Sequence, residues 1–207
     1  LLTHPMAWNR VGHLSGPLEA ARNGSFGPLL KNVLTVLGMF TFRGDPFVTY
    51  NIPGRPVFDP LTGILFVIGI ALCLWRWRRP AAVFGVLWLL TGTGPAMLSE
   101  LHSATLRAIV AQPAAYLFPG IALAEGIAWV ARRRQSWASA LMPVALAAVL
   151  ISSGWLTYRD YFIRWGQSPD TRGTYFSDLY RALEYIDAHP TDSPTVISAA
   201  FPTLPHD

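Results

Sequence analysis

The sequence is poor in charge and has almost none of two residue types that often carry chemistry. Only 14% of its residues are charged, and it has one lysine and one cysteine. A lone cysteine, Cys73, excludes an intrachain disulfide and any metal site built from cysteines. A phosphate-cradling glycine loop, a paired-histidine zinc motif and a nucleophile elbow are also missing. The sequence therefore carries no soluble catalytic signature. It identifies no cofactor, and it leaves a divalent metal open without showing a cluster of ligands for one.

Apolar residues, in contrast, are abundant and gathered into long runs. They make up 52% of the 207 residues, and the charges are concentrated between the runs. A bilayer selects this distribution because a charge in hydrocarbon costs several kcal/mol. We therefore predict an all-α integral membrane protein, a helical bundle whose first partner is the lipid bilayer. Its four transmembrane helices are expected at 61–77, 80–98, 108–131 and 135–158.

The net charge of +4 comes almost entirely from arginine, since Lys31 is the only lysine. Two short arginine clusters, at 76–79 and 132–134, connect the first span to the second and the third to the fourth. The positive-inside rule predicts that both lie in the cytoplasm. The turn between the second and third spans and both long flanks then face outside. Because the positive charge has this topological explanation, no nucleic-acid partner is expected.

The first flank, residues 1–60, is expected to be extracytoplasmic. Its apolar stretch at 28–42 contains Lys31 and is short for a span, so an interfacial or re-entrant helix is predicted. A spanning helix is the alternative, and it would move the N-terminal flank to the cytoplasm. The segment 43–60 has four prolines and two glycines, which excludes a regular helix and favours an ordered loop on the outer membrane surface.

The second flank, residues 159–207, begins with an amphipathic exit from the membrane. A helix is predicted at 177–189, with Ser177 as its N-cap and Pro190 as its stop. Thr195–Ala199 has the composition of a buried strand. One helix and one strand cannot form a core, so this flank is interpreted as the start of a truncated extracytoplasmic α/β domain.

The outer turn between the second and third spans holds the most prominent polar cluster, Glu100, His102 and Arg107. A guanidinium at a membrane surface can grip a phosphate through two charge-assisted hydrogen bonds, and an imidazole can add another donor. The alternatives are a helix-end arginine that snorkels to the interface, a solvated loop histidine, and a glutamate that pairs with one of them.

Glu125 is the one acid within the predicted spans, about two turns before the second arginine cluster. Acids inside membranes are candidate functional groups, so Glu125 is a candidate intramembrane polar site. The alternative is that Arg132 or Arg133 neutralises it at the interface.

The order of loops and spans resembles a known family. The outer loop RGDPFVTYNIPGRPVFDP leads into the span LFVIGIALCLWRWRRP, and the turn LHSATLRAIVAQPAAYLFPGIAL opens a later span with an arginine followed by a proline inside the helix. Over most of the chain, from about Arg10 to Ala199, this pattern resembles the C-terminal half of bacterial membrane glycosyltransferases. These are the relatives of dolichyl-phosphate-mannose protein mannosyltransferases and of the lipid A aminoarabinose transferase, in glycosyltransferase family 39.

The resemblance implies a GT-C fold in the bacterial inner membrane, with a sugar moved from a polyprenyl-phosphate carrier to an acceptor on the outer face. By the same resemblance, Arg107 would hold the carrier phosphate with His102 assisting, and Arg43 and Asp45 would belong to a loop over the acceptor. The lipid tail would lie against the second and third spans, where glycines such as Gly92 leave room. The family's catalytic acid lies in an earlier loop, so no catalytic residue is expected in this chain, which is interpreted as an internal piece of a longer protein.

Two other functions remain open at this point. A transporter or channel subunit would use Glu125 and the glycine–proline breaks as its solute site. A non-catalytic membrane scaffold would bind partners through its outer domain. The sugar, the acceptor and the oligomeric state are not encoded in any recognisable pattern.

Overall fold

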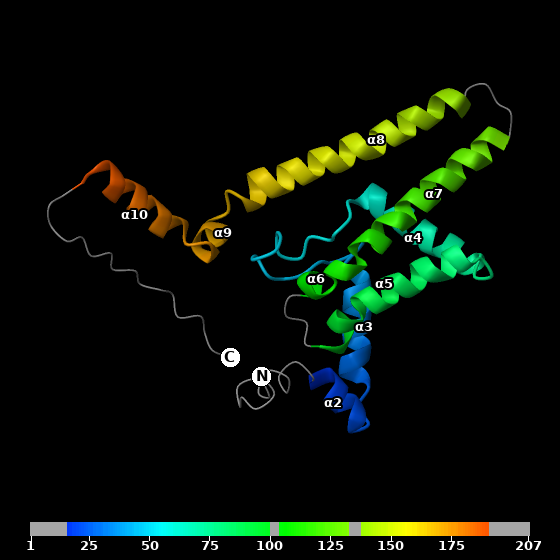
Figure 1. The fold of residues 1–207 in the computed structure, drawn as a ribbon, viewed down its shortest axis with the longest axis horizontal. Helices are drawn as coiled ribbons and strands as arrows, with labels where there is room; N and C mark the ends of the chain where they lie inside the picture. Colours follow the sequence, from blue (N-terminus) through cyan, green and yellow to red (C-terminus); the bar gives the residue numbers. More distant parts are fainter. Residues whose placement is uncertain (1–15, 100–103, 133–137, 191–207) are drawn as a thin grey trace.

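The computed structural model describes residues 16–99, 104–132 and 138–190, and every regular element in these ranges is helical (Figure 1). Four longer helices and several short ones alternate with irregular connections. The helices are α2 (Gly16–Arg22), α3 (Gly27–Gly38), α4 (Pro60–Trp75), α5 (Pro80–Leu98), α6 (Ala104–Arg107), α7 (Gln112–Arg132), α8 (Ala138–Tyr158), α9 (Pro169–Thr174) and α10 (Ser177–Ala188). A 3₁₀ turn, η1 (Ile109–Ala111), precedes α7, and a π-helical segment, η2 (Arg159–Trp165), follows α8.

Local sequence explains where α4 begins. Pro60 occupies the first helical position, where its missing N–H would have no partner in any case. The preceding Asp59 caps the helix, since its Oδ1 accepts hydrogen bonds from the backbone amides of Leu61 and Thr62 at 3.1 and 3.2 Å. Pro80 begins α5 in the same way. Both helices therefore start within one residue of the predicted spans.

The predicted all-α bundle is confirmed in its coarse form within the described residues. Two helices are long and apolar enough to cross a bilayer, Pro80–Leu98 and the continuous Ile109–Arg132, and Pro60–Trp75 is a shorter apolar helix. Only 33% and 22% of the residues in the two long apolar windows are buried, so most of this apolar surface faces outward. The count of four spans stays a prediction. The α/β domain is not seen, and its predicted strand at Thr195–Ala199 lies outside the described residues.

Glycines set the closest helix contacts. A Cβ added at Gly69 of α4 would lie 2.0 Å from the carbonyl oxygen of Phe118 in α7, so only glycine fits there. In α5, a Cβ on Gly92 would lie 2.7 Å from Cα and N of Ala111. The room that the sequence assigns to a lipid tail at Gly92 is therefore filled by the chain itself, which corrects that expectation.

The segment between α3 and α4 is an ordered loop, as predicted for 43–60. Two backbone hydrogen bonds hold the two ends of the loop together. The amide of Val57 donates to the oxygen of Met39 at 3.0 Å, and the amide of Phe58 donates to the oxygen of Phe40 at 2.9 Å. The rings of Phe40 and Phe58 then pack against Phe66 of α4, with centroids 5.2 and 5.1 Å away. These rings thus join the base of the loop to the middle of α4.

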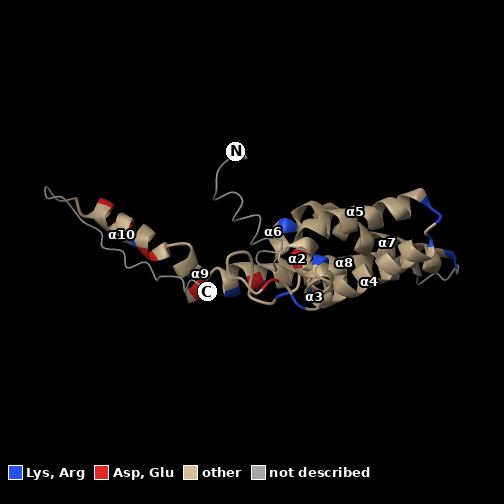
Figure 2. Cartoon of the chain, turned by 90° about the horizontal axis from the view of Figure 1, so that it is seen from below, with Lys and Arg blue, Asp and Glu red and all other residues tan. Residues whose placement is uncertain are grey.

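Both ends of the long helices carry charged residues (Figure 2). Basic residues of the α4–α5 connection and of the end of α7 lie together at one end of the long helices, and α9 and α10 lie beyond the other (Figure 2). Helix α3 runs across the long helices rather than along them, upright in Figure 1 and end-on in Figure 2.

The predicted C-terminal helix is present as α10, but its cap differs from the prediction. Ser177 is the first helical residue, and the N-cap is Phe176, in a left-handed conformation (φ 53°) with no side-chain cap. No residue of α10 is buried, and its apolar stripe has no core beneath it in the described part of the chain. The bulky Phe176 therefore turns the chain between α9 and α10 where a serine cap was expected.

Candidate functional site

A groove of about 720 Å³ lies along α3. Its walls combine apolar side chains of α3 with the first residues of the outer loop, and Ala104 of α6 closes one side. Two cations and one acid line it: Lys31 from α3, and Arg43 and Asp45 from the loop. The two predicted loop residues, Arg43 and Asp45, are therefore brought to one cavity. Lys31, which the sequence analysis used only to argue against a span, joins them because α3 and the loop are adjacent in the chain.

Asp45 is buried and both its carboxylate oxygens accept backbone hydrogen bonds. Oδ1 accepts from the amide of Phe47 at 3.1 Å, and Oδ2 accepts from the amide of Thr105 in α6 at 3.3 Å. The carboxylate thus joins the outer loop to the first turn of α6. This geometry supports a positioning role for Asp45 at the rim of the groove.

Arg107 lies at the end of α6 and is half-buried. Its Nη1 donates a hydrogen bond of 2.7 Å to Oγ of Ser99, just after α5. The backbone oxygen of Ser99 accepts a second bond of 2.7 Å from Nδ2 of the buried Asn32 in α3. Arg107 is therefore tied through Ser99 to the helix that lines the groove. The other members of the predicted cluster, Glu100 and His102, lie outside the described residues.

A smaller cavity of about 270 Å³ lies beside the groove, and Met39 lines both. Its polar lining includes Tyr50 from the loop, and Gln112 and Tyr116 from α7. Sequence analysis did not single out these residues, because a loop position and two helix positions far apart in the chain share no sequence pattern.

Glu125 has a different partner from the one predicted. Its carboxylate forms a two-pronged ion pair with Arg76, at the C-terminal end of α4, and one prong joins Nη2 to Oε2 at 2.8 Å. Arg132 contributes only through its longer-range charge. The alternative that Arg132 neutralises Glu125 is therefore corrected, and Arg133 lies outside the described residues. Glu125 pairs with the first arginine cluster instead, because α4 and α7 pack against each other. The pair bridges the two helices at their basic end.

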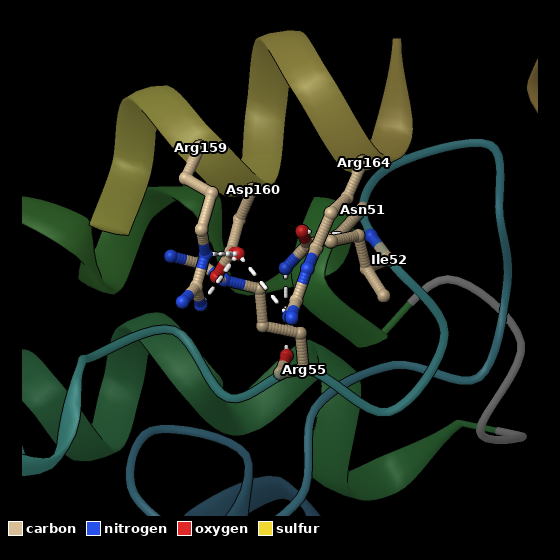
Figure 3. Close-up of polar contacts among 6 residues, drawn as sticks. All are labelled: Asn51, Ile52, Arg55, Arg159, Asp160 and Arg164. Atoms are coloured by element: carbon tan, nitrogen blue, oxygen red, sulfur yellow. Dashed lines mark hydrogen bonds and ion pairs between the residues drawn. The ribbon is translucent and has the colours of Figure 1, made fainter. Parts of the chain in front are cut away.

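A second cluster, which sequence analysis missed, surrounds Asp160 in the π-helical segment η2 (Figure 3). Oδ2 of Asp160 accepts a 2.8 Å bond from Nε of Arg55 in the outer loop, and Oδ1 accepts one of 2.9 Å from Nε of Arg159. Nη1 of Arg164 lies 3.5 Å from the same Oδ1. The spacing of Asp160 and Arg164, four residues apart, was a visible local signal, but Arg55 is 105 residues away.

The electrostatics of Asp160 follow from this geometry. Burial by itself raises the pKa of its carboxyl, but the hydrogen bonds and charges of Arg55 and Arg159 outweigh burial and hold the pKa below its ordinary value. Two further bonds tie the same segments together. Trp165 donates from Nε1 to the oxygen of Val48, and Tyr175 donates to the oxygen of Thr49, both at 2.6 Å. The outer loop and the segment after α8 are therefore one unit.

Within the described residues, no group of three or more His, Cys, Asp or Glu side chains is arranged to hold a metal ion. Comparison of the whole chain with protein-family models, with curated proteins and with solved structures gives no match.

Proposed function

We propose that this chain is part of a multi-pass GT-C glycosyltransferase of the bacterial inner membrane. The enzyme transfers a sugar from a polyprenyl-phosphate carrier to an acceptor on the extracytoplasmic face. Both flanks lie outside, and four helices cross the bilayer. The observation that carries the proposal is the apolar groove along α3 with Lys31 and Arg43 in its lining.

The membrane location is supported by the outward-facing apolar surface of α5 and α7. Lipid tails can cover such a surface, whereas exposing it to water would be unfavourable because of the hydrophobic effect. The end of the bundle with the arginine-rich connections matches a cytoplasmic face under the positive-inside rule. The opposite end, which carries the groove, is then extracytoplasmic.

The direction of α3 supports an interfacial helix. If the long helices cross the bilayer, a helix that runs across them lies along the membrane surface (Figure 1). In that orientation the exposed Leu30 and Leu34 would contact lipid chains, and Lys31 would reach the headgroup level by snorkelling. A carrier lipid has the complementary combination, an apolar chain with a negatively charged phosphate at its end.

The groove also suits the chemistry of transfer. The sugar leaves its carrier as the bond between the anomeric carbon and the phosphate oxygen breaks, and negative charge develops on the phosphate. Cations held in place stabilise that charge in the transition state. Lys31 and Arg43 supply such cations in the groove, and Arg107 lies one helical turn beyond Ala104 of its wall. The acid that deprotonates the acceptor is expected in the part of the enzyme that precedes this chain.

Binding of a long-chain polyprenyl phosphate to the purified chain in detergent tests the proposal. Lys31→Ala and Arg43→Ala should each weaken binding roughly tenfold, because each removes a charge-assisted contact. Arg22→Ala, at the end of α2 and absent from the groove lining, is the matched control and should bind as the native chain does. The corresponding polyprenol, which lacks the phosphate, should bind weakly to all of them. Equal binding of phosphate and alcohol would refute the carrier site.

A further inference from the structure

The cluster around Asp160 is unbalanced in charge. Three guanidinium groups, from Arg55, Arg159 and Arg164, approach one carboxylate within 2.8 to 3.5 Å. Asp160 is the only acid that forms an ion pair with any of them in the described part of the chain. One negative charge therefore faces three positive charges, and the cluster keeps a surplus of two.

The surplus is accessible from solvent on one side. The side chain of Asp160 is 10% exposed and that of Arg55 22%, so both are committed to holding the loop against η2. Arg164 is 61% exposed and makes the longest contact of the three, while Arg159 is intermediate at 35%. Arg159 and Arg164 lie on either side of Asp160 in Figure 3 and both approach its Oδ1. Arg164 can therefore bind an anion without breaking the bond between Arg55 and Asp160.

The surrounding residues indicate the depth of this cluster in a membrane. Exposed aromatic side chains follow one another from the end of α8 into η2: Trp155, Tyr158, Tyr161 and Phe162. Tryptophan and tyrosine gather where hydrocarbon meets the headgroups. The arginine cluster shares this stretch of chain, so it lies at the level of the phosphate groups.

We propose that Arg164 and Arg159 bind the phosphate headgroup of an anionic phospholipid of the outer leaflet. A phosphodiester matches the planar fork of a guanidinium and supplies the charge that the cluster lacks. The bound headgroup fixes the joint between the outer loop and the segment after α8. This inference depends on the proposed membrane location but not on sugar transfer, and its residues are separate from the groove that holds Lys31 and Arg43.

Native mass spectrometry of the purified chain with phosphatidylglycerol or phosphatidylcholine tests the site. The native protein should retain phosphatidylglycerol in preference to phosphatidylcholine. Arg164→Ala should weaken phosphatidylglycerol binding about fivefold, the effect of one arginine near an anionic surface. Arg164→Lys should keep most of the affinity. Arg172→Ala in α9 removes the same charge outside the cluster and should change little.

The other outcomes separate the competing explanations. An equal loss in Arg164→Ala and Arg172→Ala, or no loss in Arg164→Ala, overturns the site. Inorganic phosphate that displaces phosphatidylglycerol at equal concentration overturns the assignment to a lipid. Because Asp160 keeps Arg55 and Arg159 in Arg164→Ala, elution volume and helicity should stay native. Binding of polyprenyl phosphate should also be unchanged in this variant, so failure here is distinguishable from failure of the carrier site.

Discussion

Replacing Gly92 with alanine tests the close contact between α5 and η1, the turn before α7. The added Cβ would lie 2.7 Å from both Cα and N of Ala111 and 2.9 Å from its Cβ. Because two of these are backbone atoms, relief requires η1 and α7 to move away from α5. Overpacking of this kind costs about 1–3 kcal/mol of unfolding free energy. The gain in helix propensity from glycine to alanine, about 0.5–1 kcal/mol, offsets only part of it.

Gly94 is the matched control, two residues along the same helix. A Cβ there would meet nothing within 4 Å. Gly94→Ala should therefore leave stability unchanged or raise it by up to about 1 kcal/mol. The two variants are expected to differ by about 2 kcal/mol, although each adds a single methyl group to α5.

Unfolding in mixed micelles by titration with sodium dodecyl sulfate, followed by helicity, measures the difference. Tryptophan fluorescence adds a second readout to which Trp88 contributes, because Trp88 of α5 donates a 3.1 Å hydrogen bond from Nε1 to the oxygen of Val110 in η1. Gly92→Ala should disturb this bond and Gly94→Ala should not. Equal stability of the two variants would refute the packing of α5 against Ala111.

Three further predictions concern the charged residues. The pKa of Asp160 is below its ordinary value of 3.8, so the stability that its carboxylate contributes is fully present above pH 3.8 and is lost as the pH falls below it. Thermal unfolding measured against pH should show this loss in the native chain. Asp160→Asn should be less stable at neutral pH, and its stability should change less with pH. Glu125→Gln should lower stability in the same unfolding assay, because Arg76 loses its charged partner. The double variant with Arg76→Gln should recover part of that loss, and a further loss in it would contradict the pairing. Arg107→Ala should weaken the binding of polyprenyl phosphate roughly tenfold. Ser99→Ala removes only the hydroxyl that Arg107 contacts and should leave binding near native. Equal effects of the two changes would mean that Arg107 has a structural role alone.

The sequence by itself determined the helical class of the bundle and where two of its long helices begin. Pro60 and Pro80 at first helical positions, followed by apolar runs, place the starts of α4 and α5 within a residue of where they are found, although α4 ends at Trp75 and not at residue 77. The prolines and glycines of 43–60 predicted a loop, and a loop is present. These features depend on neighbours in the chain, through hydrogen bonding and hydrophobic periodicity, so local reading was sufficient for them.

Only the tertiary structure decided which residues meet. Asp160 and Arg55 are 105 residues apart, and Glu125 pairs with Arg76, 49 residues away, rather than with an arginine on its own helix. Gly92 and Asp45 became positions of close packing and of backbone bonding only once their partners were in place. Such pairings follow from the rotation and offset of helices as their surfaces interlock, which no single stretch of sequence specifies.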